Sequence, residues 1–245
     1  MADRDAGHLP GLARHAIAAI RDELADLALD LIDPTCKELA EELRERCPGV
    51  VPVRLPPGAT APPVSVGSAH SAALYATAFA AATQLPATAP SGSAVVWADG
   101  EHEVLIHPGR VRVLFRDGFV LVGMTVFTEQ TGTVEITVPF AVGTAAEPAG
   151  LMIATEPVPR GPALVVERWG DQLIAAAWQA LVHLAGGIAA SAGSDTAGAP
   201  LIPVALTASA AGLTVLPQAT PPVTAAGPLP AGPPPAGTGP AGEQP

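Results

Sequence analysis

Closely spaced turn signals between residues 94 and 140 constrain the fold more than any other feature of this sequence. Apolar and polar residues alternate in the runs between them, and the signals are Asp99-Gly100, Pro108-Gly109, Asp117-Gly118 and the looser Gln130-Thr131-Gly132. Asp-Gly between alternating runs is typical of a two-residue β-hairpin, because both residues tolerate positive φ. The segment therefore predicts an antiparallel meander of five strands.

Pairing the strands across these turns collects apolar side chains on one face of the predicted sheet. The expected partners are Val95 with Val104, Trp97 with His102, Ile106 with Val111, Val104 with Val113, Val113 with Val122, and Phe115 with Val120. Charged side chains fall on the opposite face, and they are Glu101, Glu103, Arg110, Arg112 and Arg116, with His107 beside them. Their signs alternate across the Pro108-Gly109 turn, which predicts cross-strand ion pairs.

The remaining pattern predicts helices and a second, small hairpin. Residues 150–155 are expected to add a sixth strand, and two helices are expected over 68–85 and from 162 to about 190, with Asp171 as an N-cap in the second. Residues 201–207 and 213–216 form the expected hairpin. We expect an α+β fold, an antiparallel five- to six-stranded meander with helices packed on one face.

Composition divides the chain into four parts. An amphipathic helical arm is expected over 1–49, and the five prolines of 50–66 indicate an extended linker or an edge segment. Residues 67–216 form the α+β core domain, and 217–245, rich in Pro, Ala and Gly, cannot build a core and should be disordered.

Charge and cysteine content exclude several classes of function. The formal net charge is −11, and only 12 Lys and Arg stand against 23 Asp and Glu, so a nucleic-acid partner is not expected. Cys36 and Cys47 lie eleven positions apart in one expected helix and are interpreted as core residues. The polar start of the chain indicates no signal peptide, so a cytoplasmic protein is expected. The apolar stretch 172–193 has mixed flanks and is not expected to span a membrane.

The polar residues near the hairpins give two candidate sites. His102 falls on the apolar face, and a pocket near Trp97, His102 and Phe115 could bind a small apolar ligand. His102 and His107 point to opposite faces of a strand, so no metal site is expected. A hydrolase using His70 beside Ser68, or using His102, is the remaining catalytic hypothesis.

The two predicted core helices carry almost no charge, which predicts that they are covered on all sides. Between Asp171 and Pro245 the only formal charges are Asp195 and Glu243. A helix that is neutral all round is normally buried, and one sheet covers only one side, so a homo-oligomer is favoured. Candidate interaction residues are the acidic ridge of the arm, Asp22, Asp26 and Asp30, together with Trp178 and His183 of the second helix.

We therefore expect a non-enzymatic cytoplasmic interaction or assembly protein that acts through protein contacts and requires no cofactor. The alternatives are a binding module for a small apolar ligand in the sheet–helix interface and the hydrolase described above. No catalytic motif is evident, so an enzyme is less expected than a non-enzymatic protein, and the question of enzymatic activity stays open at this stage.

Overall fold

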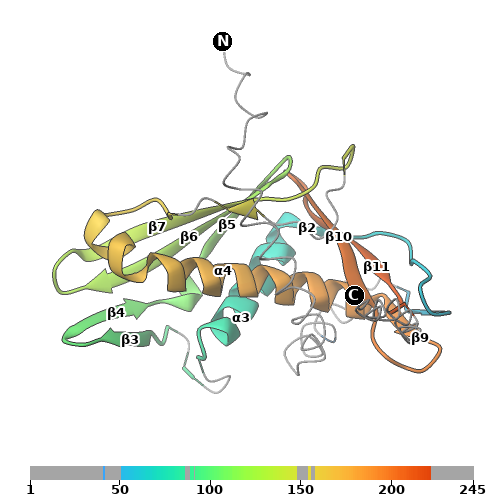
Figure 1. Ribbon diagram of the computed structural model, residues 1–245, viewed down its shortest axis with the longest axis horizontal. Coiled ribbons are helices and arrows are strands. Elements are labelled where there is room, and N and C mark those ends of the chain that lie inside the picture. The colour runs from blue at the N-terminus through green and yellow to red at the C-terminus, as the bar shows by residue number, and fades with distance from the viewer. Residues whose placement is uncertain are drawn as a thin grey trace, which may run out of the picture.

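The computed structural model describes residues 41, 51–85, 89–90, 92–147, 154–155 and 158–221. Within them, helices and antiparallel sheets combine in one fold, so the α+β class is confirmed (Figure 1). The expected N-terminal arm, apart from Glu41, lies outside the described residues, and with it the acidic ridge and both cysteines. The expected tail beyond residue 221 lies outside them too.

A six-stranded sheet occupies the region of the predicted meander. Its strands are β3 (Val95–Asp99), β4 (His102–Ile106), β5 (Arg112–Arg116), β6 (Phe119–Thr128), β7 (Gly132–Ala141) and β8 (Ala154–Thr155). The order is β3-β4-β6-β7-β8, and β5 also pairs with β6. Residues 154–155 supply the expected sixth strand, which pairs with β7. The predicted pairing of Phe115 with Val120 across Asp117-Gly118 is confirmed.

The prediction for the Pro108-Gly109 turn is wrong. Residues Pro108–Arg110 form a short 3-10 helix, η1, and β4 does not pair with β5. Instead both strands pair with β6, β4 near Phe127 and β5 between Phe119 and Gly123, so they lie end to end along one edge. Proline cannot adopt the positive φ that a type I′ turn requires, and Gly109 does not take a positive φ either.

The register of the first hairpin also differs from the prediction by two residues. Trp97 faces Val104, and Asp99 faces His102. The turn therefore consists of Gly100 and Glu101, with Gly100 at φ 61° in its first central position. Glycine at that position is one of the two common hairpin solutions. A shift of two keeps every side chain on its predicted face.

The rest of the described chain builds a second sheet and two helices. These elements are β1 (Val53–Leu55), β2 (Val64–Gly67), α3 (Ser68–Ala82), α4 (Ala163–Ser191), β9 (Gly193–Asp195), β10 (Ile202–Ser209) and β11 (Gly212–Gln218). The predicted final hairpin is confirmed as β10–β11, and β2 extends it to three strands. The segment 50–66, expected to be an extended linker or an edge segment, thus supplies part of an edge strand, and β1 pairs in parallel with β9. Helix α4 begins before Asp171, with Pro162 at the N-cap position, so Asp171 is not the cap.

The two helices pack on the valine-rich face of the six-stranded sheet. Figure 1 shows α4 running along that sheet and continuing past it to β10 and β11, with α3 beside it. Val104, Val122 and Met124 are completely buried on this face. The sheets meet where the Gly118 amide donates to the Ala208 carbonyl at 3.1 Å.

Helix α4 is buried at every position from 180 to its C-terminal end at 191. It is long and apolar enough, by length and composition, to cross a membrane, and 78% of its most apolar window is buried within the chain. The core helix of a soluble protein passes the same test. The prediction that both core helices are covered on all sides holds only in part for α3, because His70 and Ala73 are exposed.

A buried tyrosine joins the two helices. The Tyr75 hydroxyl donates a 2.7 Å hydrogen bond to the Ala177 carbonyl, and its ring stacks on Phe79 with centroids 6.3 Å apart. Burial raises the pKa of Tyr75 well above its usual value, because the phenolate would be desolvated.

Tyr75 makes a prediction for alkaline stability. An unfolded tyrosine ionises near pH 10, and folded Tyr75 ionises well above that, so its contribution to stability is complete below about pH 10 and falls as pH rises, by up to ~1.4 kcal/mol per pH unit. Since Tyr75 is the only tyrosine, phenolate absorbance reports it alone. We expect that absorbance to appear together with unfolding, and Tyr75→Phe to lower the free energy of unfolding by about 1 kcal/mol. Phenolate forming near pH 10 in the folded protein would contradict this.

Candidate functional site

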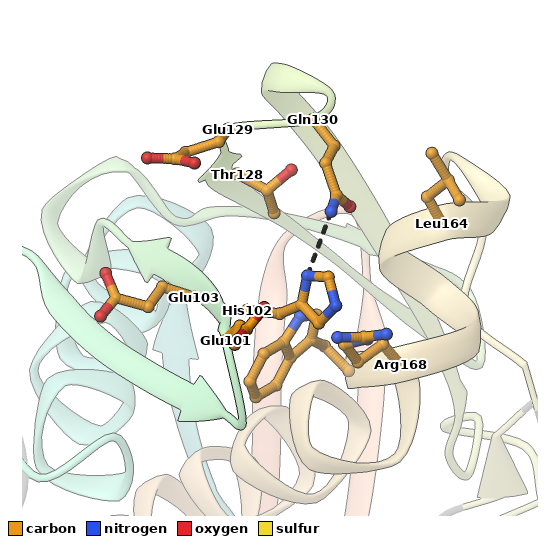
Figure 2. Close-up of a pocket in the computed structure, with 9 residues that line it drawn as sticks. Glu101, His102, Glu103, Thr128, Glu129, Gln130, Leu164 and Arg168 are labelled. Carbon is orange, nitrogen blue, oxygen red and sulfur yellow. Dashed lines mark hydrogen bonds between the residues drawn. The ribbon is translucent and has the colours of Figure 1, made fainter.

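A cavity of about 400 Å³ opens where the β3–β4 turn, the β6–β7 turn and the start of α4 come together. We call it the end cleft. Figure 2 shows residues from these three elements around it, with His102 and Gln130 pointing toward each other. Its lining residues are Glu101, His102, Glu103, Thr128, Glu129, Gln130, Leu164, Arg168 and Trp169. Three carboxylates and one guanidinium give the end cleft an acidic balance.

One hydrogen bond connects the two turns across the end cleft. Gln130 Nε2 lies 3.1 Å from His102 Nδ1, so the amide donates to the ring when the ring proton is on Nε2. In Figure 2 the carboxylates of Glu103 and Glu129 point away from the imidazole. The Gln130 amide therefore orients the imidazole through this hydrogen bond.

The described residues bring no nucleophile and base together. His70 and Ser68 are both exposed on α3, and the neighbouring Ser71 hydroxyl donates to the Val66 carbonyl at 3.0 Å. In the end cleft, the Thr128 hydroxyl is hydrogen-bonded to that of Thr131 at 2.8 Å. In the part of the chain that the structure describes, no group of three His, Cys, Asp or Glu residues is arranged to hold a metal ion. Nothing in this geometry favours the hydrolase hypothesis.

Of the predicted ligand residues Trp97, His102 and Phe115, His102 alone is among the residues that line the end cleft. Trp97 is half-buried against the core. Phe115 is buried opposite Val120, about eight residues along β6 from the end cleft, or roughly 26 Å. The separation follows from the wrong prediction at Pro108, which had placed β5 beside β4.

The predicted interaction residues of α4 are mostly covered within the chain. His183 is buried, with 6% exposure, and Trp178 is half-buried and packs against the core. The Trp178 indole N–H is buried and has no hydrogen-bond partner within the described ranges. Asp22, Asp26 and Asp30 lie outside those ranges. Within the described part of the chain, Trp178 and His183 therefore present little accessible surface.

The face of the six-stranded sheet that points away from the helices carries exposed apolar side chains, and we call it the outer face. It carries two apolar rows that run across the strands in register. The first row is Val96, Leu105 and Phe127, and the second is Leu114, Leu121 and Pro139. Val96 is 52% exposed and Leu114 is 58% exposed, and Phe119 beside the second row is 39% exposed.

Charges of opposite sign lie at opposite ends of the outer face. Glu103 follows the β3–β4 turn, while Arg112 and Arg116 lie on β5. Because β4 and β5 are end to end, the expected cross-strand ion pairs between them do not form. In the ranges that the structure describes, the single ion pair of this face joins Arg112 to Glu135 at 3.9 Å. Gly123 lies between these two residues, and a Cβ there would approach the Glu135 carboxylate to 2.7 Å.

Sequence reasoning did not identify the outer face, because it attended to the charges at these positions. The available signal was the alternation itself. Val96, Leu105 and Leu114 are large apolar residues at positions that the predicted phasing turned outward. Single exposed apolar residues are common, but aligned rows of them are not.

The His102–Gln130 contact makes a prediction about stability. His102→Ala and Gln130→Ala should each lower the free energy of unfolding by about 1 kcal/mol or less, since the bond lies at a half-exposed cleft. The double variant should cost no more than either single variant, because both remove the same bond. Urea denaturation measures this. Additive losses would show that the two side chains act separately.

No family model, no curated protein and no solved structure matches this chain.

Proposed function

We propose that this chain is a non-enzymatic cytoplasmic protein that acts by binding another protein through the outer face of its six-stranded sheet. One observation carries the proposal: the helices cover one face of this sheet, while the other face presents two aligned apolar rows to solvent. The proposal requires no cofactor and no nucleic acid.

The energetics of the apolar rows support binding. Burying a large aliphatic or aromatic side chain contributes about 1.5–3 kcal/mol. Leu114, Val96 and Phe119 are 58%, 52% and 39% exposed, so roughly half of this contribution remains available to a partner. Half-buried Leu105, Leu121 and Phe127 flank them and would exclude water from the edges of the contact.

The two alternative functions have weaker support in this geometry. An apolar ligand between sheet and helices would need space there, but Ile106, Met124 and Leu181 are completely buried at that interface. The end cleft is lined mainly by charged and polar groups. A hydrolase would need a base beside a nucleophile, and His102 is hydrogen-bonded to an amide instead.

A pair of leucine variants tests the proposal. Leu114→Glu places a charge in the second apolar row, and Leu164→Glu is its matched control, because Leu164 is 61% exposed and lies on α4, off the outer face. Both variants should keep their free energy of unfolding within about 0.5 kcal/mol of wild type. Partners captured from the native host are identified by mass spectrometry, produced pure and titrated against each variant.

We expect Leu114→Glu to weaken binding of the purified partner by about tenfold or more and Leu164→Glu to leave it within about twofold. Equal effects of the two variants would contradict the proposal. It would also be contradicted if no purified protein, this chain included, bound with an affinity that depends on Leu114.

A further inference from the structure

We propose that the partner bound to the outer face is a second copy of this chain. A two-fold axis relates the two copies. It lies between their two outer faces and crosses the strands at the level of Met124. The inference rests on the proposed function and identifies its partner. It is carried by the strand register, which makes the outer face complementary to itself.

The position of each outer-face residue can be read along β6. Leu105 is level with Phe127, while Leu114 is level with Leu121. Met124 lies midway between these levels. A two-fold axis across the strands at Met124 reverses the strand direction and keeps each strand at the same distance across the sheet. Because β4 and β5 share one edge of β6, this rotation places β4 of one copy on β5 of the other.

The apolar rows then superpose on one another. Leu105 faces Leu114 of the second copy, and Phe127 faces its Leu121. In the adjacent strand β7, Thr133 is level with Phe127 and Pro139 with Leu121, so Thr133 faces Pro139 of the second copy. Gly123 and Thr125 flank the axis on β6. The Arg112–Glu135 ion pair lies over Gly123, so both copies bring this pair to the centre of the interface.

The charges match in the same arrangement. Arg116 is level with Phe119, and Glu103, two residues before Leu105, falls at the level of residue 129. These two levels are equally distant from Met124. Each Glu103 therefore faces Arg116 of the other copy, and the dimer gains two such pairs. Both side chains are exposed, and within the described residues neither takes part in an ion pair.

The area of the outer face suits a dimer. Strands β6 and β7 have ten residues each, or roughly 33 Å, and the strand positions from β3 to β7 cover on the order of 600 Å² of sheet. Specific interfaces bury about 800 Å² per partner once side chains are included. Aligned packing of two sheets is a common arrangement, and a two-fold interface uses the same patch on both copies.

Two charge reversals and their mixture test the inference in the full-length chain. Glu103→Arg alone sets Arg against Arg116 twice in each dimer, and Arg116→Glu alone sets Glu against Glu103 twice. Each should raise the dimer dissociation constant on the order of tenfold, measured by sedimentation equilibrium. Mixing the two variants restores opposite charges at both contacts, and a heterodimer should form with nearly wild-type affinity. Glu167→Arg, on the exposed side of α4, controls for net charge.

The outcomes separate this inference from the proposed function. A monomer at all concentrations, or a dimer that neither reversal weakens, overturns the inference, and so does a mixture that dimerises no better than the single variants. If the chain is monomeric but another purified protein binds in a manner that depends on Leu114, the proposed function stands and only the identity of the partner is wrong. If the wild-type chain dimerises, each charge reversal weakens the dimer and the mixture restores it, then the dimer inference and the proposed function are both supported.

Discussion

The fixed φ of Pro108 determines how the outer face is built. With a residue that tolerated positive φ, β4 and β5 could form the hairpin that alternation suggests, and Glu103 would lie near Arg112 within one chain. Pro108 directs the chain into η1 instead, and both strands pair with β6 on the same edge. Glu103 and Arg112 are consequently separated by roughly 20 Å and cannot pair within one chain, and Arg112 pairs with Glu135 of β7 instead.

The inner face supplies the stability that allows this separation. Val104, Val122 and Ile136 are completely buried beneath α3 and α4, and burial of apolar surface is the dominant favourable term in folding. Exposed ion pairs contribute about 0–1 kcal/mol each, so their loss between β4 and β5 costs little. The fold can therefore leave opposite charges exposed on the outer face.

Alternation and turn residues predicted the side-chain faces well, because a strand has a period of two whatever its partner. Val120 and Val138 lie on the expected face, and Phe115 pairs with Val120 as predicted. The strand pairing across Pro108-Gly109 could not be predicted in the same way. Alternation does not show whether the two flanking strands pair with each other or both pair with a third strand, as β4 and β5 do with β6. Because this pairing was predicted wrongly, the sequence did not reveal the end cleft. There, His102 is hydrogen-bonded to Gln130, which lies 28 residues away in another turn.

Register decides whether two outer faces fit. The outward positions of β6 are Phe119, Leu121, Gly123, Thr125 and Phe127, so small residues lie in the middle and large apolar residues on either side. Moving the axis by one residue would shift the facing levels by two, which would place Glu103 against the apolar Leu114 of the second copy and leave Arg116 unpaired. Burying a carboxylate against an aliphatic side chain is unfavourable. Glu103 and Arg116 contribute little to the stability of one chain, but they would select a single alignment of the two copies in the dimer.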